Sequence, residues 1–146
     1  MAEVVRFVVD GDAVRAYFSD AGGDVVRHMI QLGERVKIEA QARVGVYEPP
    51  PAGPVRRRRP GTLRDSIVKR FHTTGDGVVV EVGSEDEVAL LHHEGTVPHT
   101  ITPRQPGGML VFWSPTAGRV VYARAVQHPG TQPNRFLAEA LAAVIG

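Results

Sequence analysis

The strongest pattern of apolar and polar positions lies between Asp24 and Val44. Apolar residues recur there at intervals of three and four positions, in the series Val25, Met29, Leu32, Val36 and Ala40. Charged residues occupy the other faces. This spacing predicts one long amphipathic helix that has Asp24 as its N-cap and ends at Gly45. Gly33 lies inside this helix at a cost of up to about 1 kcal/mol relative to alanine, so we expect a close neighbour there.

Shorter apolar runs predict the remaining elements. We expect strands at residues 4–9, 66–71, 78–82, 109–113 and 120–123, with a hairpin turn near residues 75–77. Short helices are predicted from about Asp12 to Ser19 and after Asn134, and residues 62–65 resemble a helix cap in which the threonine hydroxyl serves backbone amides. The chain is therefore predicted to be α+β, with an antiparallel meander packed by the long helix and a short C-terminal helix.

Two similar turn signatures frame the stretch from residue 90 to residue 131. They are His93-Glu94-Gly95-Thr96 and His128-Pro129-Gly130-Thr131. Glycine permits a positive φ in a tight reversal, and the threonine that follows can bond to the backbone. We therefore interpret Gly95, Thr96, Pro129, Gly130 and Thr131 as structural turn residues, and the stretch between the signatures as a β-hairpin with a long tip.

Composition limits the possible classes of protein. The chain has 146 residues, 42% of them hydrophobic, and no cysteine, which favours a single domain spanning residues 1–146 without thiolate ligands or disulfide bonds. No apolar run approaches the roughly 20 residues that cross a bilayer, and the N-terminus has no basic region followed by an apolar one, so we expect a soluble, unsecreted protein. Because the net charge is only +1, any role with nucleic acid must come from a local cluster.

One such cluster lies in a loop predicted from residue 48 to residue 61. Three prolines precede four consecutive arginines, Arg56, Arg57, Arg58 and Arg59. In a monomer the simplest interpretation is a solvated surface segment. The alternative is contact with phosphate or with an acidic neighbour, which gains weight if symmetry multiplies the copies.

A metal site is the main chemical alternative. His93, Glu94, His99 and His128 offer ligands for zinc or another divalent ion, as in a small metal-dependent hydrolase. Against this, the adjacent His92 and His93 would point to opposite faces if they lie on a strand, and no helical His-Glu-x-x-His arrangement is present. The sequence also has no Gly-x-Ser-x-Gly elbow and no phosphate-binding glycine loop.

The order of elements and motifs resembles the neck and minor tail-component family of long-tailed bacteriophages. The resemblance rests on the long helix, then Gly61-Thr62-Leu63-Arg64-Asp65-Ser66-Ile67, then Glu94-Gly95-Thr96, and finally Phe136-Leu137 in the last helix. The chain departs from the family where Gly61-Thr62 replaces Thr-Gly, and where Asn134-Arg135 stands in place of a proline before Phe136.

The resemblance implies a virion structural protein of the neck or tail, without catalysis or cofactor, assembled in the cytoplasm of the host bacterium. It implies a homo-oligomeric ring of six or twelve copies between the portal or connector and the tail tube or terminator. The candidate contacts with neighbouring subunits or with DNA in the channel are Arg56, Arg57, Arg58, Arg59, His93, Glu94, His99 and Arg104. A regulatory nucleic-acid binder acting through the arginine run remains a third hypothesis.

Overall fold

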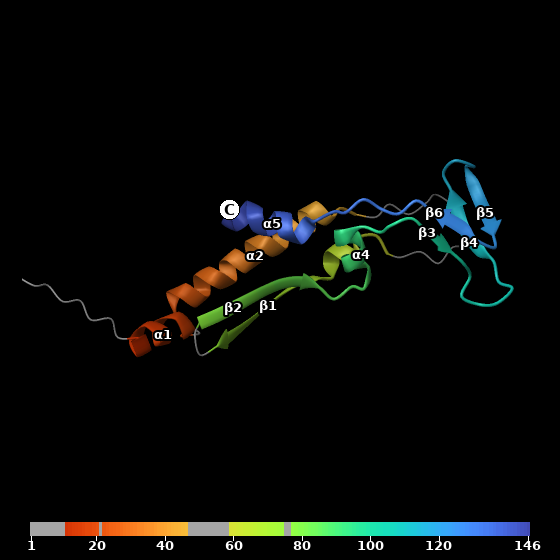
Figure 1. Ribbon diagram of the computed structural model, residues 1–146. Helices are drawn as coiled ribbons and strands as arrows, with labels where there is room; N and C mark the ends of the chain where they lie inside the picture. The colour runs from red at the N-terminus through yellow and green to blue at the C-terminus, as the bar shows by residue number, and fades with distance from the viewer. Residues whose placement is uncertain (1–10, 21, 47–58, 75–76) are drawn as a thin grey trace, which may run out of the picture.

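The computed structural model describes residues 11–20, 22–46, 59–74 and 77–146. The predicted strand at residues 4–9 and residues 47–58 of the proline- and arginine-rich loop lie outside this part of the chain. The described elements are the helices α1 (Gly11–Ser19), α2 (Asp24–Val44), α3 (Thr62–Asp65), α4 (Val88–Glu94) and α5 (Phe136–Ile145), and the strands β1 (Ile67–Thr74), β2 (Gly77–Ser84), β3 (His99–Ile101), β4 (Leu110–Ser114), β5 (Arg119–Ala123) and β6 (Val126–His128) (Figure 1).

Helix α2 is the central element, and its predicted range is confirmed. It packs against the β1–β2 hairpin and also against α5. The predicted cap at its N-terminus is wrong, because Gly23 is the N-cap and Asp24 is the first helical residue. The Asp24 carboxylate instead pairs with Arg27, one turn further along the helix, where its negative charge still suits the positive end of the helix dipole.

Gly33 lies where α2 crosses the β1–β2 hairpin, as its position inside the helix predicted. A Cβ atom at this residue would overlap Cγ1 of Val80 and lie 3.1 Å from Cδ of Lys69. Only glycine therefore permits this close approach. Lys69 also joins the two elements through polar contacts, because its Nζ donates to the carbonyl of Ile30 at 3.3 Å and pairs with Glu34 at 2.8 Å.

These contacts affect the acidity of Glu34. The hydrogen bond from Lys69, followed by the one from Lys37, lowers the pKa of this carboxyl group below its ordinary value of 4.5. A carboxyl pKa that is lower in the folded state contributes stability above the unfolded-state value and loses it as the pH falls through the folded-state value. The ion pair of Glu34 with Lys69 therefore supports the α2–β1 contact at neutral pH, and it is lost in acid together with the pair that Glu34 makes with Lys37 inside α2.

The hydrophobic core lies where α2, β1, α4 and α5 meet. Phe136, the first residue of α5, is fully buried, and Ile67 is 1% exposed. The other buried members of this cluster come mainly from α2 and α5, and they are Val36, Ala40, Val44, Ala89 and Ala140. The predicted C-terminal helix is confirmed, and its first turn anchors it in the core.

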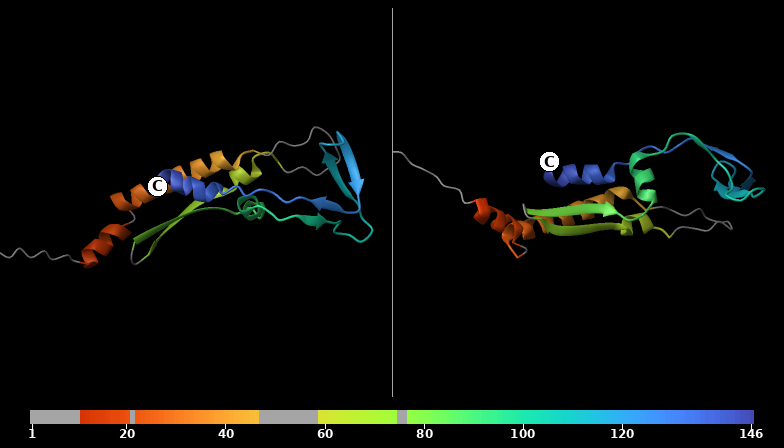
Figure 2. Two further views of the ribbon diagram at one scale, coloured as in Figure 1. Left: turned by 45° about the horizontal axis from the view of Figure 1, so that its top comes forward. Right: turned by 60° about the horizontal axis from the view of Figure 1, so that its bottom comes forward.

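The strands in the described part of the chain form three separate antiparallel pairs, β1–β2, β3–β6 and β4–β5. The α+β class is confirmed, although the pairs do not join into one continuous meander. The β1–β2 hairpin lies along α2, whereas the other two pairs stand away from the helices at the far end of the molecule (Figures 1 and 2). The long connections between β2 and β3 and between β6 and α5 account for this separation.

Two local predictions need correction. His92 and His93 lie on helix α4, residues 88–94, and not on a strand, the geometry considered for them above. The Asp86 carboxylate accepts the Val88 N–H at 2.9 Å and so stabilises the first helical turn. Residues 62–65 do form a single helical turn, but the Thr62 hydroxyl donates to the Arg59 carbonyl at 2.6 Å and does not accept from an amide. None of the helices in the described part of the chain combines the length and apolarity that crossing a membrane requires.

Candidate assembly surfaces

The two turn signatures meet and form a clasp, made by Gly95 and Thr96 on one side and Gly130 and Thr131 on the other. The N–H of Thr96 donates to the carbonyl of Thr131, and the N–H of Thr131 donates to the carbonyl of Thr96, each at 3.0 Å. The two threonine hydroxyl oxygens are 3.1 Å apart. The clasp therefore holds together two chain segments that are 35 residues apart in the sequence.

Both glycines of the clasp lie against the opposite backbone. Gly95 has a φ of 73° and Gly130 a φ of 86°. A Cβ atom at Gly95 would lie 2.5 Å from the Thr131 carbonyl oxygen, and one at Gly130 would overlap the Thr96 carbonyl oxygen. Each glycine is thus required both by its backbone conformation and by the space available. Pro129 is exposed just before Gly130.

Beyond the clasp the chain forms an arm, residues 97–130. Its first part is the β3–β6 pair, in which His99 stands opposite His128 with ring centroids 5.1 Å apart. Nδ1–H of His99 donates to the carbonyl of Val97 at 2.8 Å, and Nδ1 of His128 accepts the N–H of Gly130 at 3.0 Å. Both imidazoles therefore stabilise the local turn structure at the base of the arm.

The outer part of the arm is the β4–β5 hairpin, which has apolar side chains on both faces. Directly opposed residues share a face of a sheet, so Val111, Trp113, Val120 and Tyr122 lie on one side. The other side carries Leu110, Phe112, Val121 and Ala123. Tyr122 is 60% exposed, and among the described residues the core cluster has no member from the arm. An isolated two-stranded hairpin is at best marginally stable in water, so we expect another protein surface to cover this hairpin.

The arm also has an unusual charge. No acidic residue occurs from Gly95 to Ala138, and all acidic residues except Glu139 lie at or before Glu94. The arm itself carries Arg104, Arg119 and Arg124, which are exposed and make no ion pair within the described residues. The arm is therefore cationic as well as apolar.

His93 and Glu94 lie at the end of α4, close to the base of the arm. Nδ1 of His93 is 2.8 Å from Oε1 of Glu94, and the His93 ring contacts Phe136 edge-on with centroids 5.4 Å apart. Nε2 of His93 is buried without a hydrogen-bond partner in the described part of the chain. The neighbouring His92 contacts Asn134, whose backbone N–H donates to the His92 carbonyl at 3.0 Å. These histidines connect α4 to the start of α5.

The four side chains considered as metal ligands fall into two pairs. His93 and Glu94 lie on α4, whereas His99 and His128 face each other on the arm. Within the residues that the structure describes, no group of three or more histidine, aspartate or glutamate side chains is arranged to hold a metal ion. The arrangement does not provide the site that a metal-dependent hydrolase needs.

Of the four consecutive arginines, Arg59 is the one within the described residues. It pairs with Asp65 at 2.8 Å, next to helix α3. Arg56, Arg57 and Arg58 lie outside the described residues. Arg59 is therefore engaged by its own chain.

The comparison with known families bears on the part of the chain before the arm. Residues 14–95, more than half of the chain, match the family described as "Bacteriophage HK97-gp10, putative tail-component". The chain belongs to this HK97-gp10-like family. The resemblance to phage neck and tail-component proteins is thereby confirmed. Comparisons with the curated proteins and with the solved structures found no match. The range matched to the HK97-gp10-like family ends at Gly95, where the clasp begins.

Sequence reasoning did not identify the aromatic face of the arm, which carries exposed Tyr122 and partly exposed Trp113, as a candidate contact surface. The signals were present. Residues 109–113 and 120–123 do not alternate between apolar and polar, as a strand with one face in water would. The long interval without acidic residues was a second signal. Both features point to the apolar hairpin of the arm, whereas the predicted contact residues were chosen among arginines, histidines and one glutamate.

Proposed function

We propose that this protein is a structural component of the phage virion that assembles into a ring at the head-to-tail interface. The ring, of six or twelve copies, joins the portal or connector to the tail tube or terminator. Membership of a phage tail-component family supports a structural, non-enzymatic role in the virion. The observation that carries the assembly proposal is the arm, whose β4–β5 hairpin is apolar on both faces and stands apart from the core.

In this proposal His93, Glu94, His99 and Arg104 have different roles. The first three stabilise the base of the arm through the local contacts described above. Arg104 lies between β3 and β4 and is exposed, so it is available to an acidic neighbour or to a DNA phosphate. A ring of six copies would also gather roughly eighteen arginines from residues 56–58, in addition to Arg59, which pairs with Asp65 of its own chain.

Electron microscopy of the purified chain tests ring formation, because closed rings with a central hole are expected. The role of the arginine run is tested separately by replacing Arg56, Arg57 and Arg58 with serine. We expect this variant to fold and form rings normally but to yield fewer infectious particles, since ring docking or DNA retention depends on the lost charges.

The matched control is Arg59→Ser. Because Arg59 already pairs with Asp65 in an exposed ion pair, its loss should change stability by less than about 1 kcal/mol and leave particle yield close to that of the unmodified chain. A normal particle yield from the triple variant would refute the role assigned to the run.

A further inference from the structure

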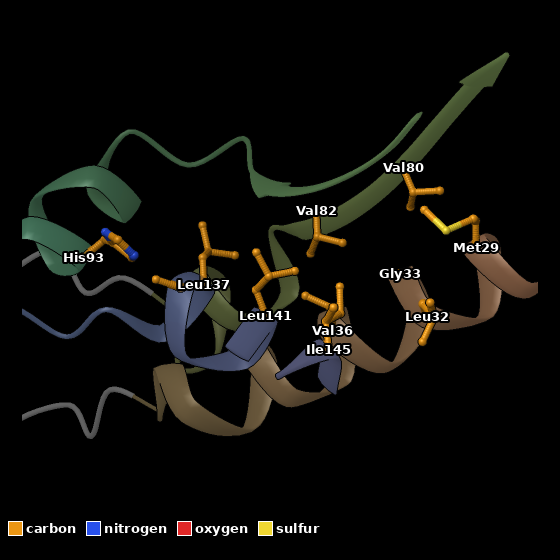
Figure 3. A pocket seen from close by; sticks show the side chains of 11 residues that line it. Met29, Leu32, Gly33, Val36, Val80, Val82, His93, Leu137, Leu141 and Ile145 are labelled. Atoms are coloured by element: carbon orange, nitrogen blue, oxygen red, sulfur yellow. The ribbon is translucent and has the colours of Figure 1, made fainter. Parts of the chain in front are cut away.

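A deep apolar groove runs along the body of the molecule. Helix α2 forms its floor, β2 forms one wall and α5 forms the other (Figure 3). The groove has a volume of 580 Å³, and its lining includes Met29, Val36, Val80, Val82, Leu137 and Leu141. His93 from α4 closes one end and is the only polar side chain among the described lining residues. A groove of this size and chemistry fits apolar side chains.

The walls of the groove leave large side chains in contact with water. Leu141 is 50% exposed and Ile145, further along α5, is 61% exposed. Both lie in the rim formed by α5, across the groove from Val82 (Figure 3). A contiguous exposed apolar surface of this kind marks a binding surface in a soluble domain.

The same chain carries a surface that matches this groove. The face of the β4–β5 hairpin that bears Trp113 and Tyr122 is apolar, and aromatic side chains of this kind are enriched at the centres of protein interfaces. Tyr122 is 60% exposed and Trp113 is partly exposed, so burying both rings would remove a part of the roughly 300–500 Å² that two fully exposed aromatic side chains present to water. Interfaces of standard size bury about 800 Å² per partner, so the neighbouring apolar residues of the hairpin, such as Val111 and Val120, would contribute to the contact as well.

The elements that line the groove, α2, β2 and α5, lie in the body, whereas β4 and β5 lie at the far end of the arm in all the views of Figures 1 and 2. The clasp directs the arm away from the body, so a hairpin cannot reach the groove of its own chain. Contact between the two surfaces therefore joins different copies head to tail. Such a heterologous contact repeats from copy to copy and closes into a ring when the rotation between copies permits.

Charge favours the same pairing. The arm is cationic and has no acidic residue, whereas exposed Glu87 lies between β2 and α4, the helix whose His93 closes one end of the groove. Opposite charges at the edges of an apolar contact favour the correct partner and its orientation.

We propose that the β4–β5 hairpin of one copy inserts its Trp113 and Tyr122 face into the α2–β2–α5 groove of the next copy. This inference rests on the proposed ring and deepens it, because it names the two surfaces that meet at each subunit boundary. It also accounts for two features at once, since the same contact covers the hairpin and fills the groove.

Thiol crosslinking tests the pairing directly, because the natural chain has no cysteine. Val120→Cys marks the hairpin face, and Ala138→Cys marks the α5 wall of the groove. When the two single variants are mixed and treated with a short bismaleimide, we expect a crosslinked dimer that contains one chain of each kind. Adding Trp113→Ala and Tyr122→Ala to the hairpin chain should lower the yield roughly tenfold or more. Leu90→Ala, an exposed truncation on α4 outside both surfaces, should leave the yield unchanged.

The remaining outcomes separate this inference from the proposed function. Closed rings without a crosslink, or rings that persist after the two aromatic truncations, would overturn the hairpin-to-groove pairing and leave the ring itself intact. Crosslinked open chains would support the pairing and contradict the closed ring, whereas a monomer at every concentration would contradict both.

Two other outcomes would assign the surfaces to different partners and overturn the pairing. A crosslink from Ala138→Cys to Val5→Cys would assign the groove to residues 4–9 instead, and binding of duplex DNA that competes with the crosslink would assign the arm to DNA.

Discussion

Replacing Phe136 with alanine is expected to lower the free energy of unfolding by about 3–5 kcal/mol. Phe136 is fully buried, begins α5 and contacts the rings of His92 and His93 from α4. The substitution leaves a cavity where α2, α4 and α5 meet. Because small domains are stable by only about 5–15 kcal/mol, the loss would be a large part of the total.

Urea unfolding followed by circular dichroism measures this effect, and the midpoint should fall without a change in the slope. The control is Phe71→Ala, the same chemical change at a residue on β1 that is 51% exposed. Its effect should be far smaller, because little apolar surface is buried there. Equal destabilisation by the two variants would contradict the position of the core.

Gly95→Ala is expected to open the clasp and to destabilise the base of the arm. Gly95 has a φ of 73° and a ψ of −177°, a backbone conformation that costs other residues about 1–3 kcal/mol. The new Cβ atom would also lie 2.5 Å from the Thr131 carbonyl oxygen and 2.8 Å from the Pro133 nitrogen. These are backbone atoms, so they cannot move aside without disturbing the paired Thr96 and Thr131 hydrogen bonds.

Gly45→Ala provides a matched control. Gly45 has nearly the same backbone angles, a φ of 73° and a ψ of −175°, but a Cβ atom there would meet nothing within 4 Å. Both variants have the same cost of backbone conformation. Only Gly95→Ala adds a steric clash, which also disturbs the two backbone hydrogen bonds between Thr96 and Thr131, worth about 0.5–1.5 kcal/mol each. Equal unfolding free energies for the two variants would show that the close approach at the clasp has no energetic weight.

The sequence was most informative where one local pattern determined the structure. The spacing of Val36 and Ala40 along a continuous apolar stripe predicted the extent of α2, although not its N-cap residue. The interior glycine at residue 33 correctly predicted a close neighbour, and the repeated Gly-Thr pairs correctly predicted a long hairpin between two bends. In each case the residue types restricted the backbone so strongly that few other local structures were compatible with the sequence.

Other features depend on contacts that are distant in the sequence. The helical state of residues 88–94 follows from the position of Asp86 and from the burial of Ala89, whereas the β-branched and aliphatic run also suited a strand. The groove could not be predicted, because three elements far apart in the chain form it. The aromatic face of the arm could have been predicted from residues 110–123, but its isolation from the core became evident only in the fold.

We propose that the arm makes the contacts between copies and that the body folds without it. Replacing residues 97–130 with a two-residue Asn-Gly turn between Thr96 and Thr131 tests this claim, because the two threonines are already paired as neighbours in a hairpin. Sedimentation analysis should find a folded monomer at every concentration for the shortened chain and a discrete ring-sized species for the full chain. Assembly of the shortened chain to the same size as the full chain would contradict the account.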